Sequence, residues 1–167
     1  MSTILSVTNQ LFSLQGGINI TDEQGALAYR AEGSFSLFSP TWRIYRGDNL
    51  VGSIRKRIFA LFSTWDIQGE LGAFKIKRTL FSFRRQYYAV GGPVDGAIVT
   101  GNLFDLRFNV SHAGDTLAKA GGRLLTIRDR HDVEILGDQE LFVVFAMVVL
   151  QLDRRDEKQR AEADEDK

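Results

Sequence analysis

Basic residues are concentrated in one stretch of the chain, and this stretch is the strongest candidate for a functional site. Residues 51–85 carry eight Lys or Arg against only Asp66 and Glu70, which gives a net charge of +6. Lys and Arg form charge-assisted hydrogen bonds with phosphate, and each can add about 1 kcal/mol to binding at an anionic membrane. The candidate headgroup ligands are Arg55, Lys56, Arg57, Lys75, Lys77, Arg78, Arg84 and Arg85.

Apolar residues interleave with this basic cluster and could insert into lipid. They are Phe59, Leu61, Phe62, Leu80, Phe81 and Phe83. Alternating cations and apolar residues also describe the two faces of an ordinary surface strand, and that interpretation predicts no ligand. The cluster could also bind nucleic acid, with its aromatic rings as stacking platforms. A formal net charge of zero over the whole chain argues against that partner, because dedicated nucleic-acid binders are usually basic overall.

No residue pattern in the chain indicates catalysis or a metal site. There is no cysteine, which excludes a disulfide framework, a thiolate zinc site and a cysteine nucleophile. His112 and His131 have no neighbouring ligand at metal-binding spacing. No Gly-x-Ser-x-Gly motif supports a Ser/His/Asp triad, although the members of a triad come together only in space. We therefore expect a protein that is not an enzyme and that needs no cofactor or metal.

Five acidic residues also lie close together in the sequence between residues 129 and 140, and such a cluster suggests calcium as a ligand. They lack the spacing of a known calcium loop, so a solvated strand face is the favoured interpretation. The residues are Asp129, Asp132, Glu134, Asp138 and Glu140.

Short segments of alternating apolar and polar residues predict the elements that position the basic cluster. Alternation places one face of each strand inward, and the Gly, Asp and Asn residues between segments suit tight hairpin turns. Pairs of strands recur about every 20 to 25 residues, which suggests a sandwich or a barrel. The segments are 18–22, 26–31, 42–46, 50–56, 64–68, 73–78, 87–90, 97–99, 108–111, 117–119 and 132–135.

The last apolar segment breaks this pattern. Residues 141–150 are apolar without interruption, with Glu140 before them and Arg154 and Arg155 after them. Acidic residues at the start and basic residues at the end favour a helix, and a helix that is apolar on every face is normally buried. Ten residues are too few for a membrane span, which needs about 20. Because Val is frequent, a central β-strand stays open as the alternative.

Length and composition predict one globular domain over residues 1–155. Residues 156–167 are highly charged and lack an apolar face, so we expect them to form a solvated, disordered tail. The first fourteen residues lack the basic start and apolar run of a secretory signal, and we expect the protein in the cytoplasm.

Five segments, in this order and at this spacing, carry a resemblance to a known family. They are residues 18–25, 54–56, 88–92, 117–119 and 141–153. The chain from about residue 11 to residue 153 resembles the LURP-one-related family, which includes the bacterial YxjI-like proteins and is related to the tubby C-terminal domain and the phospholipid scramblases. The resemblance implies a mainly β fold, a tubby-like barrel of about twelve strands that encloses a C-terminal hydrophobic helix.

A helix inside the barrel would leave no interior ligand cavity, which places function on the outer surface. Tubby-type domains hold phosphoinositide headgroups with basic residues on one side of the barrel. The resemblance therefore implies a peripheral binder of anionic phospholipid headgroups, and the alternative is a protein-interaction or stress-response scaffold with no lipid ligand. The family often has Tyr where His131 stands. The scramblases' calcium segment and cysteine-rich palmitoylation site have no match here, so we do not expect calcium-driven scrambling.

Overall fold

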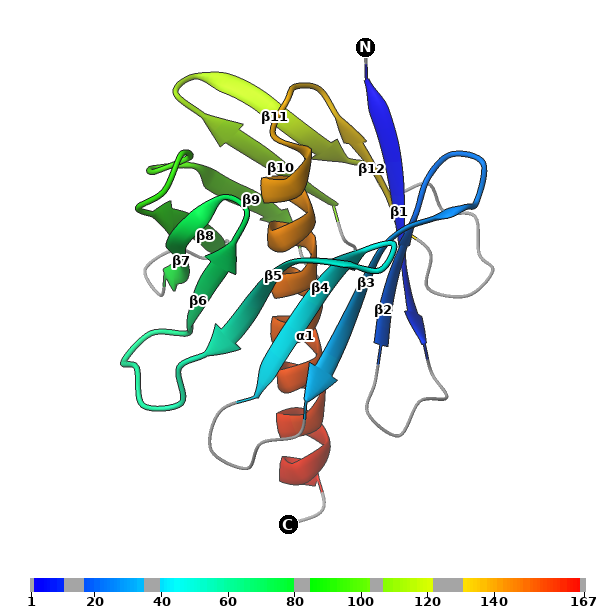
Figure 1. Ribbon diagram of the computed structural model, residues 1–167. Coiled ribbons are helices and arrows are strands. Elements are labelled where there is room, and N and C mark those ends of the chain that lie inside the picture. Colours follow the sequence, from blue (N-terminus) through cyan, green and yellow to red (C-terminus); the bar gives the residue numbers. More distant parts are fainter. Residues whose placement is uncertain are drawn as a thin grey trace.

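In the part of the chain that the structure describes, twelve β-strands and one helix make up the fold (Figure 1). The computed structural model describes residues 2–10, 17–34, 40–79, 85–102, 107–121 and 131–165. The strands are β1 (Thr3–Gln10), β2 (Gly17–Thr21), β3 (Leu27–Ser34), β4 (Thr41–Arg46), β5 (Asn49–Lys56), β6 (Thr64–Gly69), β7 (Gly72–Thr79), β8 (Gln86–Val90), β9 (Ile98–Asn102), β10 (Arg107–His112), β11 (Asp115–Ala120) and β12 (His131–Ile135), and the helix is α1 (Glu140–Glu165).

The strands form a closed antiparallel barrel. Each strand pairs with the next in the chain, and β1 closes the sheet by pairing with β12, with Thr3 opposite Ile135 and Val7 opposite His131. Closure leaves no strand edge with unpaired backbone groups. The prediction of a mainly β barrel of about twelve strands is confirmed.

Helix α1 runs through the middle of the barrel (Figure 1). An eight-stranded barrel is just wide enough for its own side chains to fill it, so a twelve-stranded barrel needs a further element inside. Residues 141–153 of α1 are all buried, which confirms the buried helix and rejects the alternative of a central strand. Among the described helices, none has an apolar stretch long enough to cross a membrane.

A glycine on β5 allows the helix to approach the sheet closely. A Cβ atom added to Gly52 would lie 2.5 Å from Cζ of Phe145 and 2.8 Å from the carbonyl oxygen of Gln68. Real Cβ atoms essentially never make contacts this short, so a larger residue would have to displace both the Phe145 ring and the backbone of β6. Phe145 also packs edge-on against Phe74, with ring centroids 6.0 Å apart. The glycine and the two rings together fix how α1 sits against β5 and β7.

Helix α1 extends past its buried segment into the charged C-terminal residues. It continues through Glu165, and its last eight described residues are solvent-exposed. The disordered tail expected over residues 156–167 stays a prediction for the protein in solution. Ala, Glu, Gln, Lys and Arg dominate this segment, and all are strong helix formers. Asp156 and Glu157 also form ion pairs with the barrel. The described part of this segment is thus a largely solvent-exposed continuation of α1.

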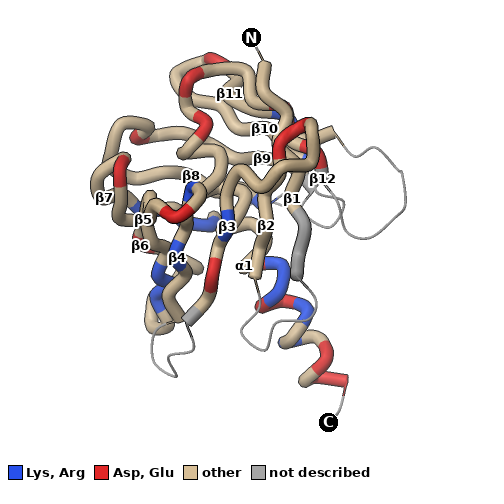
Figure 2. The backbone as a smooth tube through the Cα atoms, turned by 45° about the vertical axis from the view of Figure 1, so that its right-hand side comes forward, with Lys and Arg blue, Asp and Glu red and all other residues tan. Residues whose placement is uncertain are grey.

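Several acidic residues lie in the turns at one end of the barrel, and basic residues of β5 and β7 lie nearer the other end (Figure 2). We call the end that carries the short hairpin turns the turn end; Asp22, Asp48 and Glu70 lie in these turns. We call the other end, where α1 leaves the barrel, the exit end. The loop of residues 57–63, between β5 and β6, lies there. Basic side chains on β5 and β7 approach the exit end, because both strands run toward it.

Candidate functional site

Seven of the eight predicted headgroup ligands fall into two sets on opposite faces of the barrel wall. Ile54 and Ile76 point into the core, and side chains alternate along a strand. Lys56, Arg78 and Arg85 contact α1 and form the inner set. The outer set points away from the core and consists of Arg55, Arg57, Lys75 and Lys77. Arg84 lies outside the described residues.

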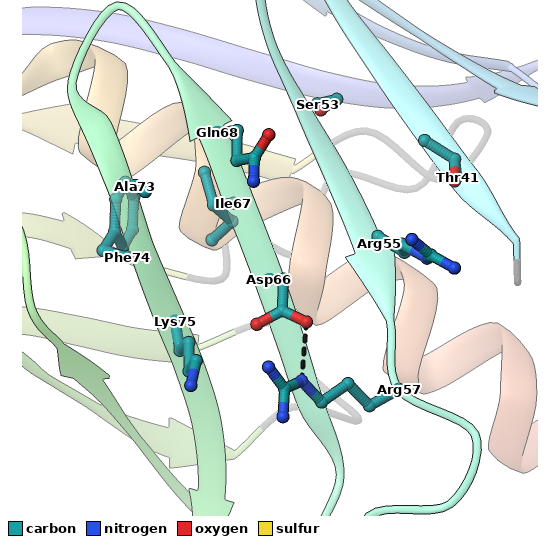
Figure 3. Close-up of a pocket in the computed structure, with 10 residues that line it drawn as sticks. All are labelled: Thr41, Ser53, Arg55, Arg57, Asp66, Ile67, Gln68, Ala73, Phe74 and Lys75. Carbon is teal, nitrogen blue, oxygen red and sulfur yellow. Dashed lines mark hydrogen bonds and ion pairs between the residues drawn. The ribbon is translucent and has the colours of Figure 1, made fainter.

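Three members of the outer set, Arg55, Arg57 and Lys75, line a pocket on strands β4 to β7 (Figure 3). Arg55 lies opposite Asp66 on the neighbouring strand, and Asp66 lies opposite Lys75 on the next. Two strand spacings separate Arg55 from Lys75 by roughly 10 Å. The pocket has a volume of about 530 Å³, and the polar residues that line it are Thr41, Ser53, Arg55, Arg57, Asp66, Gln68 and Lys75.

The pocket carries a positive charge that its one carboxylate does not cancel. Nε of Arg57 donates to Oδ2 of Asp66 at 2.6 Å. This hydrogen bond, together with the charge of Asp66, raises the pKa of Arg57. Three cations against one carboxylate leave a net charge of +2 in the pocket lining. Lys75 and Lys77 make no hydrogen bond or ion pair with any residue that the structure describes.

The loop of residues 57–63 places large apolar side chains in water beside the outer set. Phe59 is 98% exposed, Leu61 is 86% exposed and Ile58 is 48% exposed. The amide of Arg57 donates to the carbonyl of Thr64 at 2.9 Å, so the loop begins and ends next to the pocket. An exposed apolar patch on a soluble domain commonly marks a surface that contacts a partner or a membrane. Such a patch bordered by cations suits an anionic lipid surface.

The apolar residues named from the sequence have different environments. Phe59 and Leu61 lie at the exposed part of the loop, and Phe62 is partly buried. Leu80, Phe81 and Phe83 lie outside the described residues. Sequence reasoning missed Ile58, because an apolar run such as residues 58–62 gives no sign of which side chains stay exposed.

The inner set is paired with carboxylates of α1. Nη1 of Arg78 lies 2.9 Å from Oδ2 of Asp153 and 2.9 Å from Oε1 of Glu157. Arg85 also pairs with Glu157, and Lys56 pairs with Asp156. These pairs could not be recognised from the sequence, because the partners are 72 to 100 positions apart. The available signal was the spacing of the three acids, which share one face of a helix at i, i+3 and i+4.

Asp153 lies at the centre of a buried polar cluster. It is 2% exposed and accepts a hydrogen bond from the hydroxyl of Tyr87, which is equally buried. Burial, followed by the charge of Asp153, raises the pKa of Tyr87 above its ordinary value. Tyr87 therefore keeps its proton at neutral pH and remains a donor. The Trp65 ring lies 6.0 Å from that of Tyr87, and the ammonium of Lys56 lies 5.7 Å from the centre of the Trp65 ring.

Outside these two sets, the described side chains considered for metal binding or catalysis do not converge. Nε2 of His112 lies 3.1 Å from the carbonyl oxygen of Asp95, and His131 begins β12. Ser6 donates a hydrogen bond to Asp132 across the β1–β12 pair. Of the acidic cluster, Asp129 lies outside the described residues. In the parts of the chain that the structure describes, no three His, Asp or Glu side chains are placed to hold a metal ion.

Comparison with known proteins identifies one family. The LURP-one-related family model matches residues 3–151, which span all twelve strands and the buried first half of α1. No curated protein matches the chain.

Proposed function

The chain belongs to the LURP-one-related family, and from this premise we propose that it is a non-enzymatic module that docks on membrane surfaces rich in anionic phospholipid. The family is not known for enzymes. The contact surface consists of the outer set and the apolar loop residues Ile58, Phe59 and Leu61. The exit end faces the membrane.

The observation that carries this proposal is the exposure of Phe59 and Leu61 beside a pocket whose lining residues have a net charge of +2. Burying one such side chain contributes about 1.5–3 kcal/mol, and each cation near an anionic surface adds about 1 kcal/mol. Stable membrane attachment generally needs two signals. An apolar loop and a basic patch supply both, so we expect binding that is reversible and weakened by salt.

The pocket supplies the polar chemistry for headgroups. Arg55 and Lys75 can bind phosphate oxygens, and the Ser53 hydroxyl and the Gln68 amide can form hydrogen bonds with neighbouring polar atoms. Phe59 and Leu61 would enter the acyl region beside these contacts. This division of roles makes both parts necessary for tight binding.

Replacing both exposed loop residues with acid, in Phe59→Asp/Leu61→Asp, is expected to weaken binding to anionic vesicles at least tenfold. The measurement is cosedimentation with vesicles of phosphatidylserine in phosphatidylcholine, at low and at high salt. The matched control is Leu27→Asp/Leu50→Asp, which makes the same chemical change at two exposed leucines near the turn end. This control is expected to bind as well as the wild type.

Three results would count against the proposal. They are an equal loss of binding in both double variants, equal binding to pure phosphatidylcholine vesicles, and no binding to any vesicle. The last result would favour the protein-interaction scaffold. Circular dichroism of each variant checks that the barrel is folded.

A further inference from the structure

The last turns of α1 and the apolar loop emerge at the same end of the barrel (Figure 1). The inner set lies between them, and carboxylates from α1 occupy all three of its cations. The carboxylate oxygens of Asp156 and Glu157 therefore sit where the phosphate oxygens of a ligand would bind Lys56 and Arg85. A carboxylate and a phosphate compete for the same donors, because both are anionic hydrogen-bond acceptors.

The ion pairs along this face of α1 differ in how deeply they are buried. Asp153 and Arg78 are 2% and 15% exposed, and breaking such a pair leaves an uncompensated buried charge. Lys56 and Asp156 are 17% and 34% exposed. An ion pair becomes weaker, and salt screens it more strongly, as its carboxylate lies closer to water. The Asp153–Arg78 pair thus anchors the helix, while the pairs nearer its end can exchange partners.

We propose that Lys56 and Arg85 form a second anion-binding site that Asp156 and Glu157 keep closed. The proposal rests on the proposed membrane docking and adds a regulatory step to it. At a surface of low negative charge, the carboxylates hold the two cations and only the outer set binds. At a surface of high negative charge, lipid phosphates replace the carboxylates while the anchor around Asp153 stays in place. Docking then responds steeply to the density of anionic lipid.

Neutralising the two competing carboxylates tests this site. The variant Asp156→Asn/Glu157→Gln keeps the side-chain shapes and removes the carboxylates that pair with Lys56 and Arg85. At about fivefold in affinity for each cation that gains a lipid phosphate, it is expected to bind anionic vesicles about five to 25 times more tightly than the wild type. The measurement is partitioning onto phosphatidylcholine vesicles that contain increasing fractions of phosphatidylserine, and half-maximal binding is expected at a lower fraction.

A second variant controls for the change in net charge. Asp164→Asn/Glu165→Gln removes the same charge from the same helix, at residues that are exposed and form no ion pair with the described residues. It uncovers no cation, so it is expected to bind at least fivefold less tightly than Asp156→Asn/Glu157→Gln. Equal binding by the two variants would overturn the second site, and the proposed docking would stand if the wild type still bound. Failure of every variant to bind would overturn both.

A measurement without lipid distinguishes loss of the ion pairs that close the site from loss of folding. Acylation of Lys56 by an amine-reactive ester, followed by mass spectrometry, is expected to be several times faster in Asp156→Asn than in the wild type. Lys75, which forms no ion pair with described residues, serves as the internal reference. An unchanged Lys56 rate in a folded variant would overturn the closed site, whatever the vesicles show.

Discussion

Replacing Phe145 with alanine is expected to lower the free energy of unfolding by about 3–5 kcal/mol. Phe145 is fully buried, packs against Phe74 and meets the backbone of β5 where Gly52 allows its close approach. The surrounding strands are held in a closed sheet, so the cavity left by the ring cannot collapse easily. The measurement is equilibrium unfolding in urea, followed by circular dichroism.

The control for this prediction is Leu50→Ala, at an exposed leucine on the same strand as Gly52. It is expected to change the free energy of unfolding by no more than about 0.5 kcal/mol. A loss below about 1 kcal/mol for Phe145→Ala would mean that α1 is not part of the barrel core.

Removing the buried carboxylate, in Asp153→Ala, is expected to cost about 3–5 kcal/mol of unfolding free energy. Arg78 would lose its buried partner, and the hydroxyl of Tyr87 would lose its acceptor. Because Arg78 keeps its ion pair with Glu157, we expect the loss of unfolding free energy to lie at the lower end of this range. Thermal and urea unfolding of the purified variant provide the measurement.

Asp164→Ala is the control, because Asp164 is an exposed acid on the same helix. Its expected effect is within about 0.5 kcal/mol. Similar stabilities for Asp153→Ala and Asp164→Ala would show that the polar cluster does not anchor α1.

The main features of the fold could be predicted from the sequence because they depend on local patterns. Alternation of apolar and polar residues around Gly, Asp and Asn gave the hairpins, and the apolar run of residues 141–150 gave the buried helix. The end of that helix could not be predicted in the same way. Residues 156–165 have no apolar face to bury, and their ordering involves ion pairs with residues on β5 and β7.

The basic cluster shows where local patterns stop being sufficient. Because side chains alternate along a strand, Arg55 and Lys56 face opposite sides of the sheet, and so do Lys77 and Arg78. A slip of one residue in strand register would exchange the inner and outer faces. Cations that face the core are also unexpected unless they have partners. In the sequence, Asp153 was visible only as a charged residue after the apolar run, and Asp156 and Glu157 only as part of the charged tail. The sequence thus predicted the residue types of the site but not its division into two faces.

The most direct test of membrane docking at the exit end is to label the loop itself. The chain has no cysteine, so Leu61→Cys can carry a single environment-sensitive fluorophore, and Leu50→Cys carries the same probe near the turn end. Docking at the exit end predicts a blue shift and brighter emission from position 61 when phosphatidylserine vesicles are added. Salt is expected to reverse that change. The probe at position 50 is expected to show no change. An equal response at both positions, or no response at position 61 while the protein cosediments with the vesicles, would contradict docking at the exit end.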